Sequence, residues 1–173
     1  MRRLFILAVM GALAACTAQK RAEVQVDLSK KLSPGCYTVD LFDPYRIEYP
    51  SADVPTDVRK FLGVWKNGAW GGRTCHDLYI TRAYADGRVD VIDAYGPNTS
   101  AGREATVFKR TGVVKDGVLT FFSRGQAEVQ YRVQGDYLLG QRVEKLGKFE
   151  ITMSREVGIA EVPIPPVKPV RRS

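Results

Sequence analysis

From residue 74 to residue 155, apolar and polar side chains alternate one by one along the chain in one segment after another. The clearest segment is 127–134, where Ala127, Val129, Tyr131 and Val133 alternate with charged or amide residues. Successive side chains of a strand point to opposite faces, so such a segment has one apolar and one polar face. The pattern predicts seven strands, over Thr74–Arg82, Arg88–Tyr95, Glu104–Val113, Val118–Ser123, Ala127–Gln134, Tyr137–Glu144 and Lys148–Arg155.

The connections between these strands are short and rich in turn residues. Asp-Gly and Gly-Asp pairs supply the positive backbone φ angles that tight hairpins need. Parallel neighbours would need a crossover of a dozen or more residues, and these connections are too short for one. We therefore expect consecutive strands to pair antiparallel in a meander, with turns at Asp86-Gly87, Gly96-Pro97-Asn98, Asp116-Gly117, Arg124-Gly125, Gly135-Asp136 and Lys145-Leu146-Gly147.

An eighth strand is predicted at Leu62–Trp65, continuing to Trp70 after a turn signal at Asn67-Gly68. Before it, apolar side chains three or four residues apart predict one short helix over Pro55–Leu62. Eight antiparallel strands joined by hairpins close into an up-and-down barrel, which removes exposed sheet edges. The fold class predicted is therefore all-β, an eight-stranded antiparallel up-and-down barrel with a short N-terminal helix. A seven-stranded sandwich is the alternative, although it normally needs longer crossing connections.

The first sixteen residues have the order of an export signal. Arg2 and Arg3 are followed by the apolar run Leu4–Val9 and then by small residues up to Cys16. The apolar run is too short to span about 30 Å of hydrocarbon, which takes about 20 apolar residues. We therefore expect residues 1–15 to be a signal peptide that is removed.

The sequence Leu13-Ala14-Ala15-Cys16 resembles the lipobox of bacterial lipoproteins. This resemblance implies that the Cys16 thiol receives a diacylglycerol, and that Cys16 becomes the N-terminus of the mature chain. Thr17 in place of aspartate implies sorting to the outer membrane, with the folded part facing the periplasm. Two acyl chains give a stable attachment to the lipid bilayer. An ordinary signal peptide with a chance cysteine is the alternative.

The remaining chain is long enough for one domain with a single core. Residues 16–50 lack lasting periodicity and are expected to form a lipidated tether and an extended segment, residues 51–158 the barrel, and residues 159–173 a proline-rich basic tail. Loss of Arg2 and Arg3 lowers the formal net charge from +7 to +5. No segment concentrates positive charge, so we expect the protein not to bind nucleic acid. We also expect a monomer.

Cys36 and Cys75 are left as an even pair once Cys16 carries lipid. A disulfide between two such cysteines persists in an oxidising compartment. We expect this bridge to pin the N-terminal segment to the barrel wall. The alternative is two separate thiols, with Cys75 buried in its strand as a small apolar residue.

Gly63-Val64-Trp65, at the opening of the first predicted strand, resembles the Gly-x-Trp motif of the calycins, which include lipocalins, fatty-acid-binding proteins and avidins. In those barrels the tryptophan closes one end, and a basic residue near the end of the last strand lies across its ring. The resemblance covers roughly residues 54–156 and implies that Gly63, Trp65 and Arg155 close this barrel. A guanidinium over an indole contributes about 0.5 to 2 kcal/mol.

The interior of an eight-stranded barrel is either filled by side chains or just wide enough for one small ligand. His76 is the only histidine, and alternation places it on the same face as Leu78 and Ile80. It is either a polar anchor of a pocket or a hydrogen-bonded residue at the barrel mouth. The residues we expect to contact a ligand are Trp70, His76, Tyr79, Tyr95 and Tyr131.

Motifs of catalysis are not evident. No nucleophile elbow, phosphate-binding glycine loop or Ser-His-Asp set can be assembled, and one histidine leaves too few ligands for a zinc site. We therefore expect no enzyme activity, metal or cofactor. Two functions stay open. The barrel binds a small apolar or amphipathic ligand, or it is filled and the protein is a non-enzymatic interaction or inhibitor protein that contacts an envelope protein or peptidoglycan.

Overall fold

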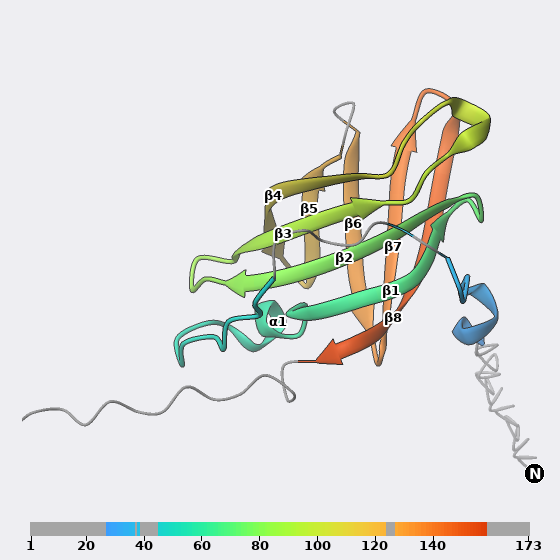
Figure 1. Cartoon of the computed structure of the whole chain (residues 1–173). Coiled ribbons are helices and arrows are strands. Elements are labelled where there is room, and N and C mark those ends of the chain that lie inside the picture. The colour runs from blue at the N-terminus through green and yellow to red at the C-terminus, as the bar shows by residue number, and fades with distance from the viewer. Residues whose placement is uncertain (1–26, 37, 39–44, 124–126, 159–173) are drawn as a thin grey trace, which may run out of the picture.

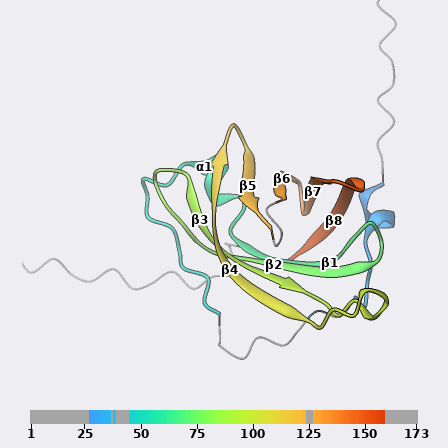
Figure 2. The same cartoon turned by 90° about the horizontal axis from the view of Figure 1, so that it is seen from above.

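The computed structural model describes residues 27–36, 38, 45–123 and 127–158. Its strands form one closed barrel in which each strand pairs with its neighbours in the sequence and the last pairs with the first (Figure 1; Figure 2). The strands are β1 (Gly63–Trp70), β2 (Thr74–Ala83), β3 (Arg88–Tyr95), β4 (Thr106–Lys115), β5 (Val118–Phe122), β6 (Glu128–Gln134), β7 (Tyr137–Glu144) and β8 (Gly147–Gly158). The short helices of the described part are η1 (Leu28–Lys31), α1 (Thr56–Arg59) and η2 (Thr99–Ala101).

The predicted all-β, antiparallel, up-and-down barrel is confirmed, with α1 lying within the predicted helical range. Tight turns form as the residues require: Asp116 has a φ of 51° and Gly117 a φ of 71°. β8 is longer than predicted and ends at Gly158, because its last residues pair with the start of β1 and close the barrel. Glu104 lies before β4 instead of in it, in a connection that contains η2.

Asn67-Gly68 does not form the predicted turn. β1 runs through both residues, with a register shift between Trp65 and Gly68. Asn67 takes a φ of 61°, and its backbone carbonyl accepts a hydrogen bond of 2.7 Å from the amide of Ser33. The pair therefore forms a β-bulge. Because β2 and β8 flank β1 on both sides, a bulge keeps the ladders that a hairpin turn would break.

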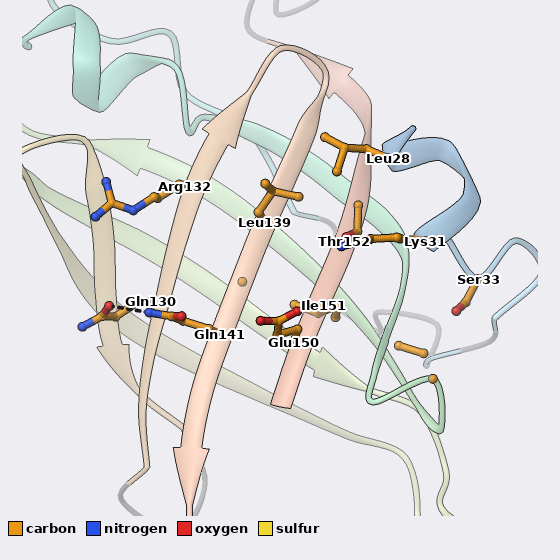
Figure 3. A pocket seen from close by; sticks show the side chains of 13 residues that line it. Leu28, Lys31, Ser33, Gln130, Arg132, Leu139, Gln141, Glu150, Ile151 and Thr152 are labelled. Atoms are coloured by element: carbon orange, nitrogen blue, oxygen red, sulfur yellow. Dashed lines mark hydrogen bonds between the residues drawn. The ribbon is translucent and has the colours of Figure 1, made fainter. Parts of the chain in front are cut away.

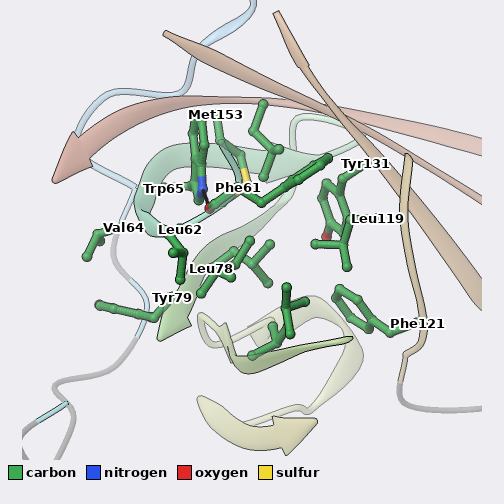
Figure 4. Packing of buried hydrophobic residues seen from close by; sticks show 14 of the residues in the cluster. Phe61, Leu62, Val64, Trp65, Leu78, Tyr79, Leu119, Phe121, Tyr131 and Met153 are labelled. Carbon is green, nitrogen blue, oxygen red and sulfur yellow. Dashed lines mark hydrogen bonds between the residues drawn. The ribbon is translucent and has the colours of Figure 1, made fainter. Parts of the chain in front are cut away.

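A hydrophobic core fills the barrel interior from the end next to α1 (Figure 4). Trp65 and Phe61 are fully buried there, and the indole Nε1 of Trp65 donates a hydrogen bond of 2.9 Å to the Phe61 carbonyl. Leu119 and Tyr131 come from β5 and β6 on another part of the wall. Burial of an aromatic or leucine side chain contributes about 1.5 to 3 kcal/mol, so this cluster is a main source of stability.

The chain before α1, which we call the N-terminal segment, is bonded to β2 at Cys36, Thr38 and Glu48. Cys36 and Cys75 form a disulfide, with Cα atoms 5.3 Å apart. The Thr38 hydroxyl donates a hydrogen bond of 2.7 Å to the buried Asp77 carboxylate, and the Glu48 amide donates one of 2.8 Å to the Thr81 carbonyl. The segment is thus held along β2 by covalent and polar contacts.

The stretch 16–50, expected to form a tether and an extended segment, contains one short helix in its described part. Residues 28–31 form η1, because the Asp27 side chain accepts hydrogen bonds from the backbone amide and the hydroxyl of Ser29. The predicted signal peptide, Cys16 and the tail from residue 159 lie outside the described residues. Within the described part, no helix combines the length and apolar character that a membrane-crossing helix needs.

Candidate functional site

At the end of the barrel next to α1, which we call the closed end, Arg155 lies across Trp65. The guanidinium carbon is 3.9 Å from the ring centroid. Its two terminal nitrogens donate hydrogen bonds of 3.0 and 2.9 Å to the carbonyl oxygens of Leu62 and Lys60. These contacts join β8 to the segment that leads from α1 into β1, and they leave this end occupied by protein side chains.

Gly63 allows the two closing strands to approach each other. It has a φ of 131°, and a Cβ atom placed on it would lie 2.1 Å from the Val157 carbonyl oxygen. No other residue fits there without displacement of the backbone. The three residues named by the motif, Gly63, Trp65 and Arg155, therefore lie together at the closed end.

The opposite end of the barrel, which we call the mouth, contains a cavity of about 280 Å³. The ends of β2, β3, β4 and β7 contribute to its wall, together with the connection after β3. Its volume lies just below the usual range for small-molecule sites, about 300 to 1,000 Å³. Positive and negative side chains occur in equal number in the lining, which includes Thr74, Tyr95, Arg103, Glu104, Thr106, Arg142 and Glu144.

A buried polar cluster lies on the inward faces of β2, β3, β4 and β6, close to the mouth. His76 Nε2 is 3.1 Å from the Tyr131 hydroxyl oxygen and 3.4 Å from Asp93 Oδ1. Arg110 Nε donates a hydrogen bond of 2.8 Å to Asp93 Oδ2. His76 and Asp93 are fully buried, so the Arg110 guanidinium provides the compensation that a buried carboxylate needs.

Arg142 connects this cluster to the mouth cavity. Its guanidinium carbon lies 4.6 Å from the centroid of Trp70 and 5.4 Å from that of Phe149. Its Nε lies 3.1 Å from Glu144 Oε1, and its side chain is only 16% exposed. The rings of Tyr95 and His76 also lie near this position, tilted against each other with centroids 4.5 Å apart. The site thus combines a guanidinium with aromatic walls.

Burial sets the protonation states in the cluster. Burial, with help from the charges of Arg142 and Arg110, lowers the pKa of His76 to about 3, so the imidazole is neutral at pH 7. Burial also raises the pKa of Asp93 to about 6, although its hydrogen bond to Arg110 acts in the other direction. Burial likewise raises the pKa of Tyr95 and Tyr131. At pH 7 the cluster therefore contains a carboxylate, two guanidinium groups and a neutral imidazole.

These pKa values affect stability in opposite directions. Unfolded His76 binds a proton below about pH 6.5, whereas folded His76 does not until about pH 3, so this residue lowers the stability as the pH falls through that window. Folded Asp93 binds its proton near pH 6, before the unfolded residue at 3.8, and thus opposes the loss between those values.

Two buried nitrogens in this region, Nε1 of Trp70 and Nε of Arg142, make no hydrogen bond of normal geometry to any described residue, although Arg142 Nε lies 3.1 Å from Glu144 Oε1. Buried polar groups are nearly always paired, with protein or with another molecule. Both nitrogens lie close to the mouth cavity, where water or another molecule can accept their hydrogen bonds.

Four of the five predicted ligand-contacting residues, Trp70, His76, Tyr95 and Tyr131, come together here. Tyr79 does not join them. It lies on the opposite face of β2, where its ring packs 4.6 Å from that of Tyr45 on the outside of the barrel. Its burial comes from the N-terminal segment that covers this face.

Sequence reasoning missed the three charged residues of the site, Asp93, Arg110 and Arg142. A signal for them exists, because each occupies an inward position of its strand. Asp93 pairs with the inward Leu78, Arg110 with Val91, and Arg142 with Val129. A charged residue on the apolar face of an alternating strand marks a buried polar site.

A second, shallower pocket lies on the outside of the barrel, between η1 and the outer faces of β6, β7 and β8 (Figure 3). It has a volume of about 440 Å³. Gln141 Nε2 donates a hydrogen bond of 3.1 Å to Gln130 Oε1 on its floor, and Leu28 and Lys31 of η1 line one side. The lining of this outer groove includes neither Trp70 nor Arg142, the two residues with an unpaired buried nitrogen.

Comparison with known proteins finds no family model that matches the chain, and no curated protein or solved structure that is similar to it. Within the described residues, no group of three or more histidine, cysteine, aspartate or glutamate side chains is arranged to hold a metal ion. The interpretation of the site therefore rests on its own geometry.

Proposed function

We propose that this protein is a monomeric lipoprotein of the bacterial outer membrane whose barrel binds one small amphipathic molecule at its mouth. The observation that carries this proposal is that the mouth cavity is lined by Arg142, whose Nε is unpaired, and that the unpaired Nε1 of Trp70 belongs to a ring in contact with that guanidinium. Aromatic rings and a guanidinium in the same place suit a ligand with an apolar body and a polar group. Binding, without catalysis, is the role proposed.

The packing of side chains at the closed end favours the mouth as the place where a ligand binds. Trp65 and Arg155 occupy that end, and Phe61 and Leu62 are fully buried beside them. A ligand that enters at the mouth thus meets a packed core below the His76 cluster. This arrangement favours a short ligand over a long acyl chain.

The proposed location rests on the lipobox at Leu13 to Cys16, and the disulfide of the folded part is consistent with an oxidising compartment. Replacement of Cys16 by serine removes the thiol that would receive the lipid. We expect the Cys16→Ser protein to incorporate no palmitate analogue in metabolic labelling, and to stay unprocessed or soluble. Label on Cys16→Ser at the level of the unchanged protein would contradict the anchor.

The binding role is tested by filling the cavity. Thr106 lines the mouth, so Thr106→Trp should exclude the ligand. Thr111 lies on the same strand with its side chain exposed on the outer face, and Thr111→Trp is the matched control. Native mass spectrometry of protein purified from its own host is expected to find a bound small molecule on the unchanged chain and on Thr111→Trp, with at least a tenfold lower occupancy on Thr106→Trp.

Equal occupancy in both variants would place the ligand elsewhere. A measured mass equal to that of the polypeptide alone, for the unchanged protein, would contradict the binding role.

The second candidate function, a filled barrel that contacts another envelope component, is favoured by the outer groove of about 440 Å³ with its paired glutamines. A protein without any bound small molecule would favour that function.

A further inference from the structure

We propose that the molecule bound at the mouth is a zwitterion of amino-acid size, with its carboxylate toward Arg142 and Trp70 and its ammonium group toward the glutamates of the rim. This inference rests on the proposed function and adds the chemical class of the ligand. It stands on three features of the site: that both unpaired nitrogens can only donate, how the charges of the lining balance, and how large the cavity is.

Both unpaired nitrogens can only donate a hydrogen bond. Trp70 Nε1 has no acceptor among the described residues, and Arg142 Nε lies 3.1 Å from Glu144 Oε1 without the geometry of a hydrogen bond. Their side chains are in contact, with the guanidinium carbon 4.6 Å from the indole centroid. Asp93 cannot serve them, because it faces His76 and accepts a hydrogen bond from Arg110. The inner end of the site thus needs an acceptor with two oxygens, and a carboxylate has that chemistry.

The charges of the cavity wall argue against a simple anion. Arg103 and Arg142 are matched by Glu104 and Glu144 in the lining, and beneath them Arg110 is matched by Asp93. The neutral His76 adds no charge. A ligand with a carboxylate alone would give the wall and ligand together a net negative charge. A ligand that also carries an ammonium group keeps the balance, since Glu104 and Glu144 can accept hydrogen bonds from it.

The volume of the cavity limits the size of the zwitterion. About 280 Å³ accommodates a single amino acid and excludes a peptide of several residues. The Tyr95 ring, whose neighbours are His76 at 4.5 Å and Phe108 at 6.3 Å between centroids, supplies an apolar wall for a side chain. We therefore expect amino acids with apolar or aromatic side chains to bind more tightly than glycine.

Isothermal titration calorimetry of the mature protein with the twenty common amino acids tests the inference, together with the amide and the N-acetyl derivative of each one that binds. We expect at least one amino acid to bind with a Kd below 1 mM, and both of its derivatives to bind at least tenfold more weakly. The amide lacks the carboxylate charge and the N-acetyl form lacks the ammonium charge, so this comparison needs no change in the protein.

Variants assign the two charges to their partners. We expect Arg142→Gln to weaken binding of the amino acid at least tenfold but to leave the weak binding of its amide unchanged. Glu144→Gln should weaken the amino acid without changing its N-acetyl derivative. Arg88→Gln and Glu156→Gln are matched controls, because both residues are exposed on the outer surface away from the mouth, and both should bind as the unchanged protein does.

The outcomes separate this inference from the proposed function. An N-acetyl derivative that binds as tightly as its parent would overturn the zwitterion in favour of a plain carboxylate, and an amide that does so would overturn the carboxylate contact. If none of the amino acids binds, the chemical class proposed here is wrong. In that case a small molecule still found by native mass spectrometry, and lost in Thr106→Trp, would leave the binding role in place.

Discussion

Replacement of Trp65 by alanine is expected to lower the free energy of unfolding by about 3 to 5 kcal/mol. The indole is fully buried at the closed end, and its Nε1 donates a hydrogen bond of 2.9 Å to the Phe61 carbonyl. Its removal leaves a large cavity and an unpaired carbonyl group between α1 and β8. Urea unfolding followed by circular dichroism measures the loss, since one of the two fluorescent tryptophans is absent from the variant.

The partner of Trp65 makes this test specific for the barrel. Arg155→Ala should destabilise less than Trp65→Ala, because its side chain is only partly buried. The guanidinium lies 3.9 Å from the indole centroid, so the two losses should be coupled in a double-mutant cycle. Arg88→Ala, at an exposed position, is a control that should be additive with Trp65→Ala. Strictly additive losses for Trp65 and Arg155 would contradict a contact between the first and last strands.

Removal of the disulfide has the second large effect. Cys36 and Cys75 close a loop with a sequence separation of 39 residues, and the double change Cys36→Ser with Cys75→Ser should lower the free energy of unfolding by about 3 to 4 kcal/mol. Without the bridge, the segment that supplies Thr38 and Tyr45 to the outer face of β2 is held only by weaker contacts. Chemical unfolding of both proteins under non-reducing conditions measures the difference.

A reducing agent provides the control for that experiment. It should destabilise the unchanged protein to the level of the double variant and have no effect on the variant itself. Peptide mapping without reduction should recover residues 36 and 75 as one linked species in protein taken from its own host. Two free thiols in such protein, or equal stability of the two proteins, would show that the bridge does not hold the segment.

The strands of the barrel were predictable because alternation and turn residues agree along most of the chain. Val129 and Tyr131 face the interior of the barrel as their period of two requires, and Asp116-Gly117 turns where its positive φ angles allow. Asn67-Gly68 carries the same local signal but forms a bulge, since pairing to β2 and β8 on both sides outweighs the preference for a turn. That pairing depends on residues far away in the sequence, and a local pattern does not contain it.

The candidate site was predictable only in part. Alternation places His76 with Leu78 on the inner face of β2, and by the same count it places Tyr79 outside. An aromatic side chain on the outer face is expected to be exposed to solvent. Tyr79 is buried because the N-terminal segment covers that face. Asp93 was missed because a carboxylate in a strand is normally solvated, and its burial depends on Arg110 from the next strand.

The most direct test of a ligand-binding barrel is a crystal structure of the protein purified from the organism that makes it, without added ligand. We expect electron density for a single non-protein molecule in the mouth cavity, within hydrogen-bond distance of Arg142 Nε and Trp70 Nε1, and in contact with Tyr95. A cavity that contains only water, with the unpaired nitrogens of Arg142 and Trp70 hydrogen-bonded to water molecules, would contradict a ligand-binding barrel.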